Sequence, residues 1–450
     1  GNIPWFKSGE LSADYIDLSV ETVTELALKQ ASLRYNKVGD VLLAMYGATI
    51  GKTSILKVRA TTNQAVCACT PFTGFSNIFL LTLLKAYRPK FIGMGTGGAQ
   101  PNISREKIIA TVISLPPLAE QHRIVAKVDE LMALCDQLEA QTEASVDAHK
   151  TLVEVLLATL TDAKDADELN DNWQTISQHF DVLFTTQASI DQLKQTILQL
   201  AVMGKLVKQD PFDEPASKLL ERIATEKQQL IKDGKIKKQK PLPPITDEEK
   251  PFELPNGWEW SKCLDICMKI TDGEHATPKR SDSGHYLLSA RNVTNEGILL
   301  HDVDFVPTEE FVRIRKRCDP NIGDILISCS GSVGRVALVD RNDAYSMVRS
   351  AAMIRPDSDN LEKEYLALML RSPYLQIQMK NRSKQSAQAN LFLGAISNLV
   401  SIIPPLAEQY RIVAKVAELM DLCDSLKANL NQAQTTQLHL ADAVVEKALN

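Results

Sequence analysis

"PPLAEQHRIVAKVDELMALCDQLEA" (116–140) recurs 288 residues later as "PPLAEQYRIVAKVAELMDLCDSLKA" (404–428), with 20 of 25 positions identical. Self-similarity at a fixed offset is the signature of a repeated architecture. The match extends backwards, since "GDVLLAMYGATIGK" (39–52) aligns with "GDILISCSGSVGR" (323–335) after one gap. The sequence therefore predicts two copies of one unit, each a mixed globular part followed by a helix.

Each repeated stretch predicts a long helix. Its apolar residues are spaced by 4, 3, 4 and 3 positions, which is a heptad seam. The Pro-Pro pair marks the start, and later apolar positions let each helix extend to about 45 residues, or about 65 Å. A helix with one narrow apolar stripe needs a partner, so we expect the two copies to pair, antiparallel or crossed, as a spacer. The seam residues are Ile124, Val128, Leu131, Cys135 and Leu138 in the first copy, and Ile412, Val416, Leu419, Cys423 and Leu426 in the second.

Composition is that of a soluble globular protein, with 44% apolar and 24% charged residues in 450 positions. No apolar run approaches the ~20 residues that a membrane span needs. The eight cysteines form no C-x-x-C pair, so we expect no metal site and free thiols in the reducing cytoplasm.

No catalytic motif is visible in the chain. "GATIGKTS" (47–54) is similar to a phosphate loop, but only three residues separate Gly47 from Gly51, where that loop needs four. The following "TSILKVRATT" predicts a strand, so no helix N-terminus would face a phosphate. We interpret the stretch as a glycine-permitted turn between two strands. A nucleotide hydrolase that depends on Lys52 is the alternative.

The charge distribution separates the globular parts from the rest. Residues 1–114 hold twelve Lys and Arg against seven Asp and Glu, and residues 260–400 hold eighteen against seventeen. The remainder is acidic, twenty against thirty-two, within a net charge of −6. This asymmetry suits phosphate contact by the two globular parts.

We therefore predict an α+β protein in which two mixed α/β recognition domains are separated by long paired, coiled-coil-like helices in a pseudo-twofold internal repeat. "GNIPWFKSGEL" (1–11) best matches "GHYLLSARNV" (284–293), so about thirty residues of the first unit are expected to have no counterpart here. The expected parts are a first recognition domain (1–114), a first spacer helix (115–165), a central helical region and linker (166–250), a second recognition domain (251–402) and a second spacer helix (403–450).

Two related domains on a spacer suit a ligand with two separated features, such as duplex DNA with a split recognition sequence. The copies agree in their helices and diverge in their globular parts, as expected if each domain reads different bases. The alternative is a coiled-coil adaptor whose globular domains bind proteins. Salt-dependent binding to duplex DNA would separate the two hypotheses.

Several motifs carry a family resemblance: "LPNGWEW" (254–260), "TDGEHATP" (271–278), "GDILISCSGSVGR" and the repeated "PPLAEQ" helix. Over essentially the whole chain they resemble the specificity (S) subunit of Type I restriction-modification enzymes. The resemblance implies a non-catalytic subunit with two target recognition domains, each reading half of an interrupted site in double-stranded DNA. Compared with the family's pattern, the N-terminal conserved segment and the start of the first recognition domain are expected to have no counterpart in residues 1–450.

The resemblance also implies partners and their cofactors. Two methyltransferase (M) subunits would modify adenines with S-adenosylmethionine, and restriction (R) subunits would translocate and cut DNA with ATP and Mg²⁺. No cofactor is expected in this chain.

Candidate DNA-contacting residues are polar or basic side chains beside glycine turns, suited to base edges or phosphates. "RIRKR" (313–317) is the densest basic cluster, with backbone contact and a solvated loop as alternatives. The first-domain candidates are Lys7, Ser8, Tyr46, Thr49, Lys52, Asn63, Gln64 and Gln100. The second-domain candidates are Thr271, Asp272, Gly273, His275, Thr277, Ser289, Arg291, Ser330, Ser332, Arg335 and Arg349.

Overall fold

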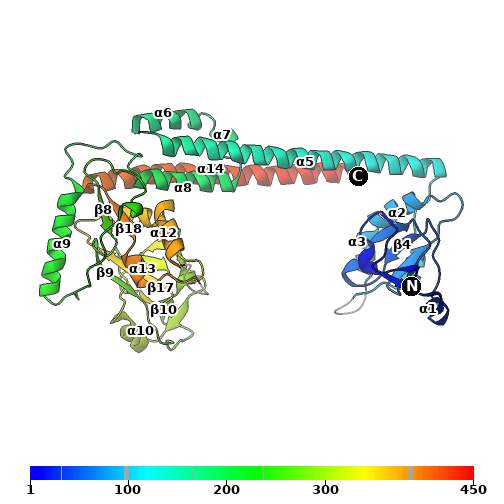
Figure 1. Ribbon diagram of the computed structural model, residues 1–450, viewed down its shortest axis with the longest axis horizontal. Helices are drawn as coiled ribbons and strands as arrows, with labels where there is room; N and C mark the ends of the chain where they lie inside the picture. The colour runs from blue at the N-terminus through cyan, green and yellow to red at the C-terminus, as the bar shows by residue number, and fades with distance from the viewer. Residues whose placement is uncertain (32, 96–100, 165, 237, 384–388, 450) are drawn as a thin grey trace. The chain divides into compact units, whose positions relative to one another are not determined.

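The computed structural model describes residues 1–31, 33–95, 101–164, 166–236, 238–383 and 389–449. It divides into two compact units, Gly1–Val146 and Asp147–Asn450 (Figure 1). The boundary falls inside a long helix, α5 (Leu118–Asp162). Each unit holds a globular α+β domain and helical elements, which confirms the predicted fold class, and each is described by itself below.

Unit 1 builds its globular domain from short strands and small helices. The strands are β1 (Ile3–Phe6), β2 (Tyr15–Ile16), β3 (Glu21–Val23), β4 (Val41–Ala44), β5 (Thr53–Leu56), β6 (Thr61–Thr62) and β7 (Val66–Cys69). The helices are η1 (Ser8–Glu10), α1 (Glu25–Gln30), η2 (Gly47–Thr49), α2 (Asn77–Ala86), α3 (Arg88–Met94) and α4 (Arg105–Ile109).

The strands of unit 1 form two sheets. In the first, β1 lies between antiparallel β3 and parallel β6, and in the second the order is β2-β5-β4-β7. Strands β4 and β5 are buried at every position, and in β5 the buried hydroxyls of Thr53 and Ser54 donate to Leu42 O (2.7 Å) and Ala13 O (2.6 Å). Helix α2 covers them with its buried Leu80, Leu81 and Leu84. The domain thus has its own core.

The stretch "GATIGKTS" joins β4 and β5, which pair antiparallel. Gly47 and Gly51 have φ angles of +59° and +81°, in the left-handed region that favours glycine. The turn holds only the short 3-10 helix η2, and Thr53–Leu56 after it is a strand, so no α-helix begins here. The prediction of a glycine turn between two strands is confirmed.

Unit 2 repeats this build with additional elements. The strands are β8 (Glu259–Lys262), β9 (Cys267–Asp272), β10 (His285–Leu288), β11 (Val293–Thr294), β12 (Gly297–Ile298), β13 (Asp304–Val306), β14 (Ile325–Ser328), β15 (Val336–Leu338), β16 (Tyr345–Met347), β17 (Ala351–Pro356) and β18 (Val400–Ile403). The helices are α6 (Ala166–Ser177), α7 (Phe180–Leu183), α8 (Gln187–Val202), α9 (Ala216–Lys232), η3 (Asp247–Glu249), η4 (Ala290–Asn292), α10 (Thr308–Arg315), α11 (Lys363–Arg371), α12 (Pro373–Ser383), α13 (Leu393–Ser397) and α14 (Leu406–Leu449).

Three strands of each unit 1 sheet have counterparts in the sheets of unit 2. Order β13-β10-β16 corresponds to β3-β1-β6, with the same antiparallel and parallel pairings. Order β15-β14-β17 corresponds to β5-β4-β7, and here β9 adds a fourth strand beside β17. A further pair, β8 and β18, joins the start of the domain to its end. The sheets therefore confirm the internal repeat.

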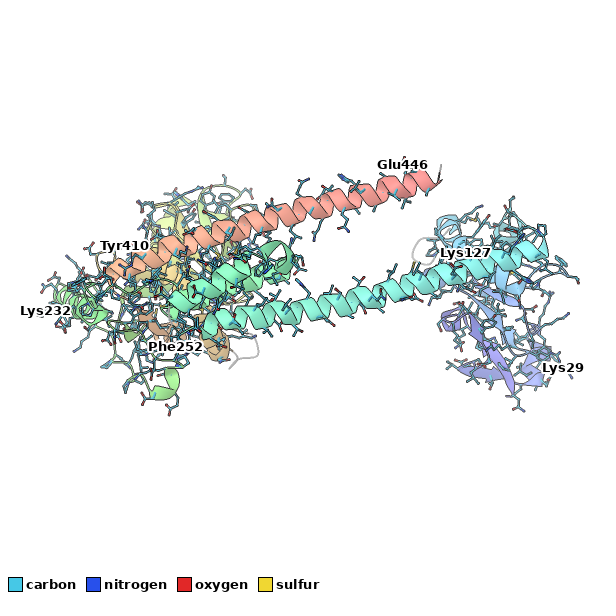
Figure 2. The ribbon with its side chains drawn as sticks, turned by 90° about the horizontal axis from the view of Figure 1, so that it is seen from above. Lys29, Lys127, Lys232, Phe252, Tyr410 and Glu446 are labelled. Carbon is cyan, nitrogen blue, oxygen red and sulfur yellow. The ribbon has the colours of Figure 1, made fainter. Side chains whose placement is uncertain are left out.

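The repeated stretches form long helices, α5 with 45 residues and α14 with 44. Within unit 2, α8 packs antiparallel along α14: Lys194 pairs with Asp424 at 2.5 Å, and Gln187 with Asn431 at 3.2 Å. The seam of α14 is buried in the same apolar cluster as α8. Figure 2 follows α14 from Tyr410 to Glu446 as one continuous helix. Mutual covering of the two repeated seams stays a prediction.

A buried glutamine ties each globular domain to the first turn of its own helix. Gln121 donates from Nε2 to Pro116 O (2.9 Å) and accepts through Oε1 from the N–H of Ser76 (2.8 Å). Gln409 donates to Pro404 O (2.9 Å) and accepts from the N–H of Glu362 (2.9 Å). Both glutamines are fully buried. The two copies therefore share one joint between domain and helix.

Candidate nucleic-acid interface

Polar loops leave the carboxyl ends of matching strands in both units. In unit 1, the Asn63 N–H donates to Phe6 O (3.0 Å), so the segments after β1 and β6 lie side by side. In unit 2, the Val348 N–H makes the same bond to Leu288 O (3.0 Å), after β10 and β16. We call these segments, with the loops after β4 and β14, the reading edges.

A bridge in each unit joins the reading edge to a distant part of the chain. Tyr46 pairs with Asn102, and Ser330 pairs with Asn390 at the equivalent position of the repeat. Candidates Tyr46 and Ser330 thus occupy the same place in the two domains, although one is a large aromatic side chain and the other a small hydroxyl. The shared backbone presents different chemistry, which is what two readers of different sequences need.

The reading edge of unit 2 borders a hollow of about 380 Å³. Four of the sequence-predicted residues line it: Asp272, His275, Ser330 and Arg349. Asn390 and the exposed Phe392 line it as well. Hydrogen-bonding groups, a cation and an exposed aromatic ring converge here, and such a combination suits base edges, phosphates and stacking.

Asp272 organises this hollow. His275 Nε2 lies 2.7 Å from its Oδ2, and Arg317 binds its Oδ1. Partial burial alone would raise the pKa of Asp272, but hydrogen bonds from Arg317 and His275 outweigh burial and lower it. The ionised carboxylate therefore positions two cationic or hydrogen-bonding groups at the reading edge.

Gly273 follows Asp272 for a steric reason. A Cβ at this position would lie 2.2 Å from Met347 O, so only glycine permits the loop to cross β16 so closely. Thr271 is half-buried near the end of β9, and Thr277 is exposed beyond the loop. Gly273 is thus structural, and neither threonine lines the hollow.

The other unit 2 candidates are held by local contacts. Ser289 binds Asn292 Oδ1 (3.1 Å), and Arg291 forms ion pairs with Asp304 (3.2 Å) and Asp302 (3.5 Å). Ser332 lies exposed in the turn after β14, and the half-buried Arg335 donates its N–H to Ser328 Oγ (2.9 Å). The structure does not bring these four into the hollow.

"RIRKR" forms internal ion pairs. Arg313 binds Glu310 (2.9 Å) and Glu274 (2.8 Å), which accounts for the raised pKa of its guanidinium. Arg315 is largely buried and binds Tyr345 O (2.8 Å) and Asp343 (2.7 Å), while Arg317 binds Asp272. Arg313 and Arg315 are thus held by contacts inside the domain, whereas the half-exposed Arg317 lies beside Asp272 at the reading edge, and DNA-backbone contact by the cluster stays a prediction.

In unit 1 the glycine turn borders a basic hollow of about 450 Å³. Lys52, Lys85 and Arg88 line it, with Asp14 as the acidic neighbour of Lys85 at 2.5 Å. Among the described residues, the cations of Lys52 and Arg88 form no ion pair. Excess positive charge beside a permissive turn suits a phosphate group.

The remaining first-domain candidates have structural contacts. Lys7 binds Glu21 and stacks over Trp5, and Ser8 begins η1. Thr49 Oγ1 donates to Tyr46 O (2.6 Å), and Asn63 Oδ1 accepts from Ala65 N (3.2 Å). Gln64 is exposed beside Asn63. Gln100 lies outside the described residues.

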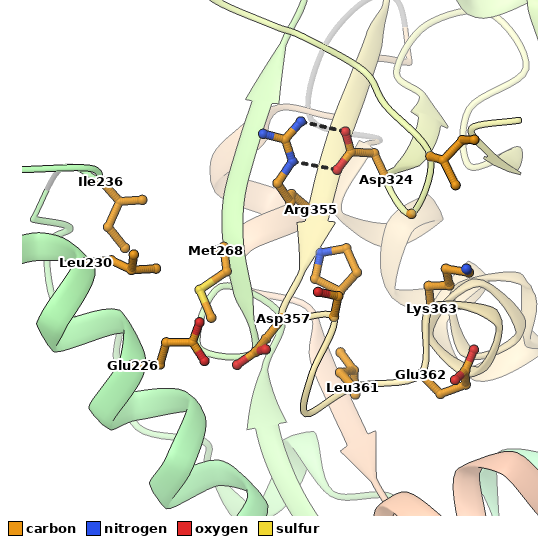
Figure 3. Close-up of a pocket in the computed structure, with 14 residues that line it drawn as sticks. Glu226, Leu230, Ile236, Met268, Asp324, Arg355, Asp357, Leu361, Glu362 and Lys363 are labelled. Carbon is orange, nitrogen blue, oxygen red and sulfur yellow. Dashed lines mark hydrogen bonds and ion pairs between the residues drawn. The ribbon is translucent and has the colours of Figure 1, made fainter. Parts of the chain in front are cut away.

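A third hollow, of about 440 Å³, lies between α9 and the ends of β9 and β17 (Figure 3). Arg355 is bound to Asp324 by two hydrogen bonds of 2.7 Å, so its charge is neutralised. The carboxylates of Glu226 and Asp357 face one another there, and burial together with the charge of Asp357 raises the pKa of Glu226. An acidic lining repels phosphate, so this hollow is a poor DNA surface.

Sequence reasoning missed Asn390 and Phe392 in unit 2, and Lys85 and Arg88 in unit 1. Asn390 could have been found, because Asn102 and Asn390 occupy the same place in the repeat. The others come from segments without a motif and reach the interface only through tertiary packing.

Among the described residues no group of His, Cys, Asp and Glu is placed to hold a metal. Nor does any helix of that part of the chain have the length and apolar character to cross a bilayer.

A duplicated α+β domain, each copy with a matched polar edge and followed by a long helix, is typical of a protein with two similar binding domains. A model of the Type I restriction modification DNA specificity domain matches residues 1–148 and 255–434. The chain belongs to this family.

The similar proteins agree with this assignment. The Type I restriction enzyme EcoEI specificity subunit of Escherichia coli is 42% identical over 384 residues, covering 82% of this chain and 64% of that protein. The EcoAI specificity subunit of Escherichia coli is 41% identical over 390 residues, covering 84% and 66%. The chain thus spans just under two thirds of the length of these relatives.

One solved chain has a similar fold. It comes from work on complex assembly and conformational transition of the type I R-M system. Its TM-score is 0.51 at 17% identity, and the match covers 99% of this chain and 90% of that one. This likeness concerns the fold.

Proposed function

We propose that the chain is the DNA-reading part of a Type I restriction-modification specificity subunit. Each reading edge contacts one half of an interrupted site in double-stranded DNA. The observation that carries the proposal is the repeated edge: equivalent backbone bridges at Tyr46 and Ser330 present unlike side chains. The family and the names of the relatives support it.

The two domains would use different contacts. In unit 2, Arg349, Ser330 and the His275 and Arg317 pair held by Asp272 contact bases and backbone. In unit 1, Lys52 contacts a phosphate at the hollow that Lys85 and Arg88 share. Charge-assisted bonds of this kind supply affinity, and groove contacts supply sequence preference.

The chain itself is non-catalytic in this proposal, and acts in the cytoplasm as a scaffold for M and R subunits. S-adenosylmethionine, ATP and Mg²⁺ belong to those partners. No observation favours the alternative of a protein adaptor without DNA binding.

Mapping methylated adenines tests the proposal directly. In cells that contain the natural full-length protein and its M partner, residues 1–114 are exchanged for those of a relative. We expect one half of the methylated site to change and the other half to remain. A change in both halves, or in neither, would contradict the assignment of one half-site to each domain.

A further inference from the structure

The two copies of the helical seam have unlike surroundings. Leu419 is 4% exposed and Cys423 is fully buried, because α8 covers them. At the equivalent positions of α5, Leu131 is 48% exposed and Leu138 53%, and Cys135 is exposed as well. Within unit 2 the apolar seam is buried by α8, whereas within unit 1, taken by itself, no described element covers Leu131, Cys135 and Leu138.

Two strand edges show the same difference. Val400 and Ile403 of β18 are buried beside β8, whereas their equivalents, Val112 and Leu115, are 82% and 59% exposed and lie outside any strand. Strand β17 is paired on both sides, with β14 and β9. Among the described residues its counterpart β7 pairs with β4 alone, which leaves a free edge.

One segment covers all three sites in unit 2. Helix α8 covers the seam, β8 pairs with β18, and β9 pairs with β17, and these elements follow one another along residues 187–272. We propose that the corresponding surface of unit 1 is the docking site of a segment built like residues 187–272, whose helix is more basic than α8. The surface consists of the α5 seam, residues 112–115 and the edge of β7.

Charge complementarity specifies the helix. In unit 2, Lys194 faces Asp424, Asp191 faces Lys427 at 3.9 Å, and Gln187 faces Asn431. The repeat places Asp136, Glu139 and Glu143 at those three positions of α5. A helix identical to α8 would set Asp191 against Glu139, so the docked helix carries cations at the positions of Gln187 and Asp191 and keeps the lysine of position 194.

The test supplies such a segment from this chain itself. A second copy of residues 184–283 is joined to Gly1, because Ile3 begins β1 as His285 begins β10. Alkylation of Cys135 is followed by peptide-mapping mass spectrometry, and amide exchange is followed at residues 66–69 and 112–115. We expect alkylation to slow at least about tenfold and both sets of amides to gain protection, as in cooperative docking.

Variants of the added copy separate docking from non-specific contact. The double change Gln187→Lys and Asp191→Lys in the added copy is expected to slow alkylation of Cys135 about threefold further, because two new ion pairs form. Adding Glu139→Lys in α5 is expected to remove this further slowing. Ile190→Asp with Leu193→Asp, which removes the apolar face, is expected to abolish protection.

Three results would overturn the proposal. The first is unchanged alkylation and exchange in a fusion whose circular dichroism shows that it is folded. The second is slow alkylation of Cys135 in dilute chain 1–450, since another part of the chain would then cover the seam. The third is protection that rises with concentration together with a dimer in sedimentation, since a second copy would then be the occupant.

Discussion

Leu131 and Leu419 occupy the same position of nearly identical 25-residue stretches, yet one is half exposed and the other is buried. The shared sequence specifies a helix with an apolar seam in both copies. What differs is the element that packs on it, because α8 is supplied by a separate part of the chain. Nearly identical local sequences therefore form the same secondary structure, but the equivalent leucines contribute unequally to the free energy of unfolding.

Truncating these two leucines gives the largest expected contrast. Leu419→Ala removes buried methyl groups from the contact with α8 and should lower the free energy of unfolding of unit 2 by about 2–4 kcal/mol. Leu131→Ala should cost less than about 0.5 kcal/mol. Denaturant unfolding can be followed by tryptophan fluorescence, since Trp173, Trp258 and Trp260 report unit 2 and Trp5 reports unit 1. Equal costs would mean that both seams are covered.

The next contrast concerns the reading edges. Asp272→Asn removes the charge that holds Arg317 and His275, and should weaken binding of the full-length protein to its duplex site about 30-fold. Asp282→Asn, at an exposed position nearby, is the matched control. Fluorescence anisotropy with labelled duplex measures both. Equal binding by the Asp272→Asn variant and the wild-type protein would remove the hollow of unit 2 from the interface.

Unit 1 should behave differently, because Lys52 has no carboxylate partner among the described residues. Lys52→Ala should weaken binding about fivefold and lower the slope of log affinity against log salt by about one. Lys29→Ala, on the exposed α1, should change neither quantity. A steep slope that survives the Lys52 substitution would place the phosphate contact elsewhere.

The smallest effect is on pH dependence. The pKa of Asp272 is lowered in the folded protein, so the ionised form stabilises unit 2 above the unfolded-state pKa. That contribution is lost as the pH falls through the folded-state pKa. Acidification from about pH 5 to about pH 3 should therefore destabilise the wild-type more than Asp272→Asn, by less than about 1 kcal/mol after solvent screening. Thermal unfolding of both proteins across this pH range measures the difference. If the stability of the wild-type and of Asp272→Asn fell equally with pH, the Asp272 carboxylate would not contribute to the stability of unit 2.

Local and repeated features of this fold could be predicted from the sequence. The heptad seams predicted the long helices, and the spacing of Gly47 and Gly51 predicted a turn between two strands. The internal repeat was sufficient to show that the glycine turn at 47–51 corresponds to the glycine turn at 331–334. These features depend on residues that are neighbours in the chain or on comparison of one copy with the other.

Features that depend on distant packing could not be predicted. Nothing near Ile412 identifies α8 as the helix that buries it. Likewise, nothing in "RIRKR" shows that Glu274 and Glu310 bind Arg313, and that Asp343 binds Arg315. Charge counts along a chain do not show which cations are already neutralised.

The buried glutamine joint has a consequence for orientation. Because Gln121 and Gln409 bond both the entry to their helix and the cap of the domain's own helix, neither domain can swivel freely about its long helix. The azimuth of each reading edge around its helix axis is then set by one side-chain amide at the base. Each domain is therefore held at a fixed rotation about the axis of the long helix that follows it.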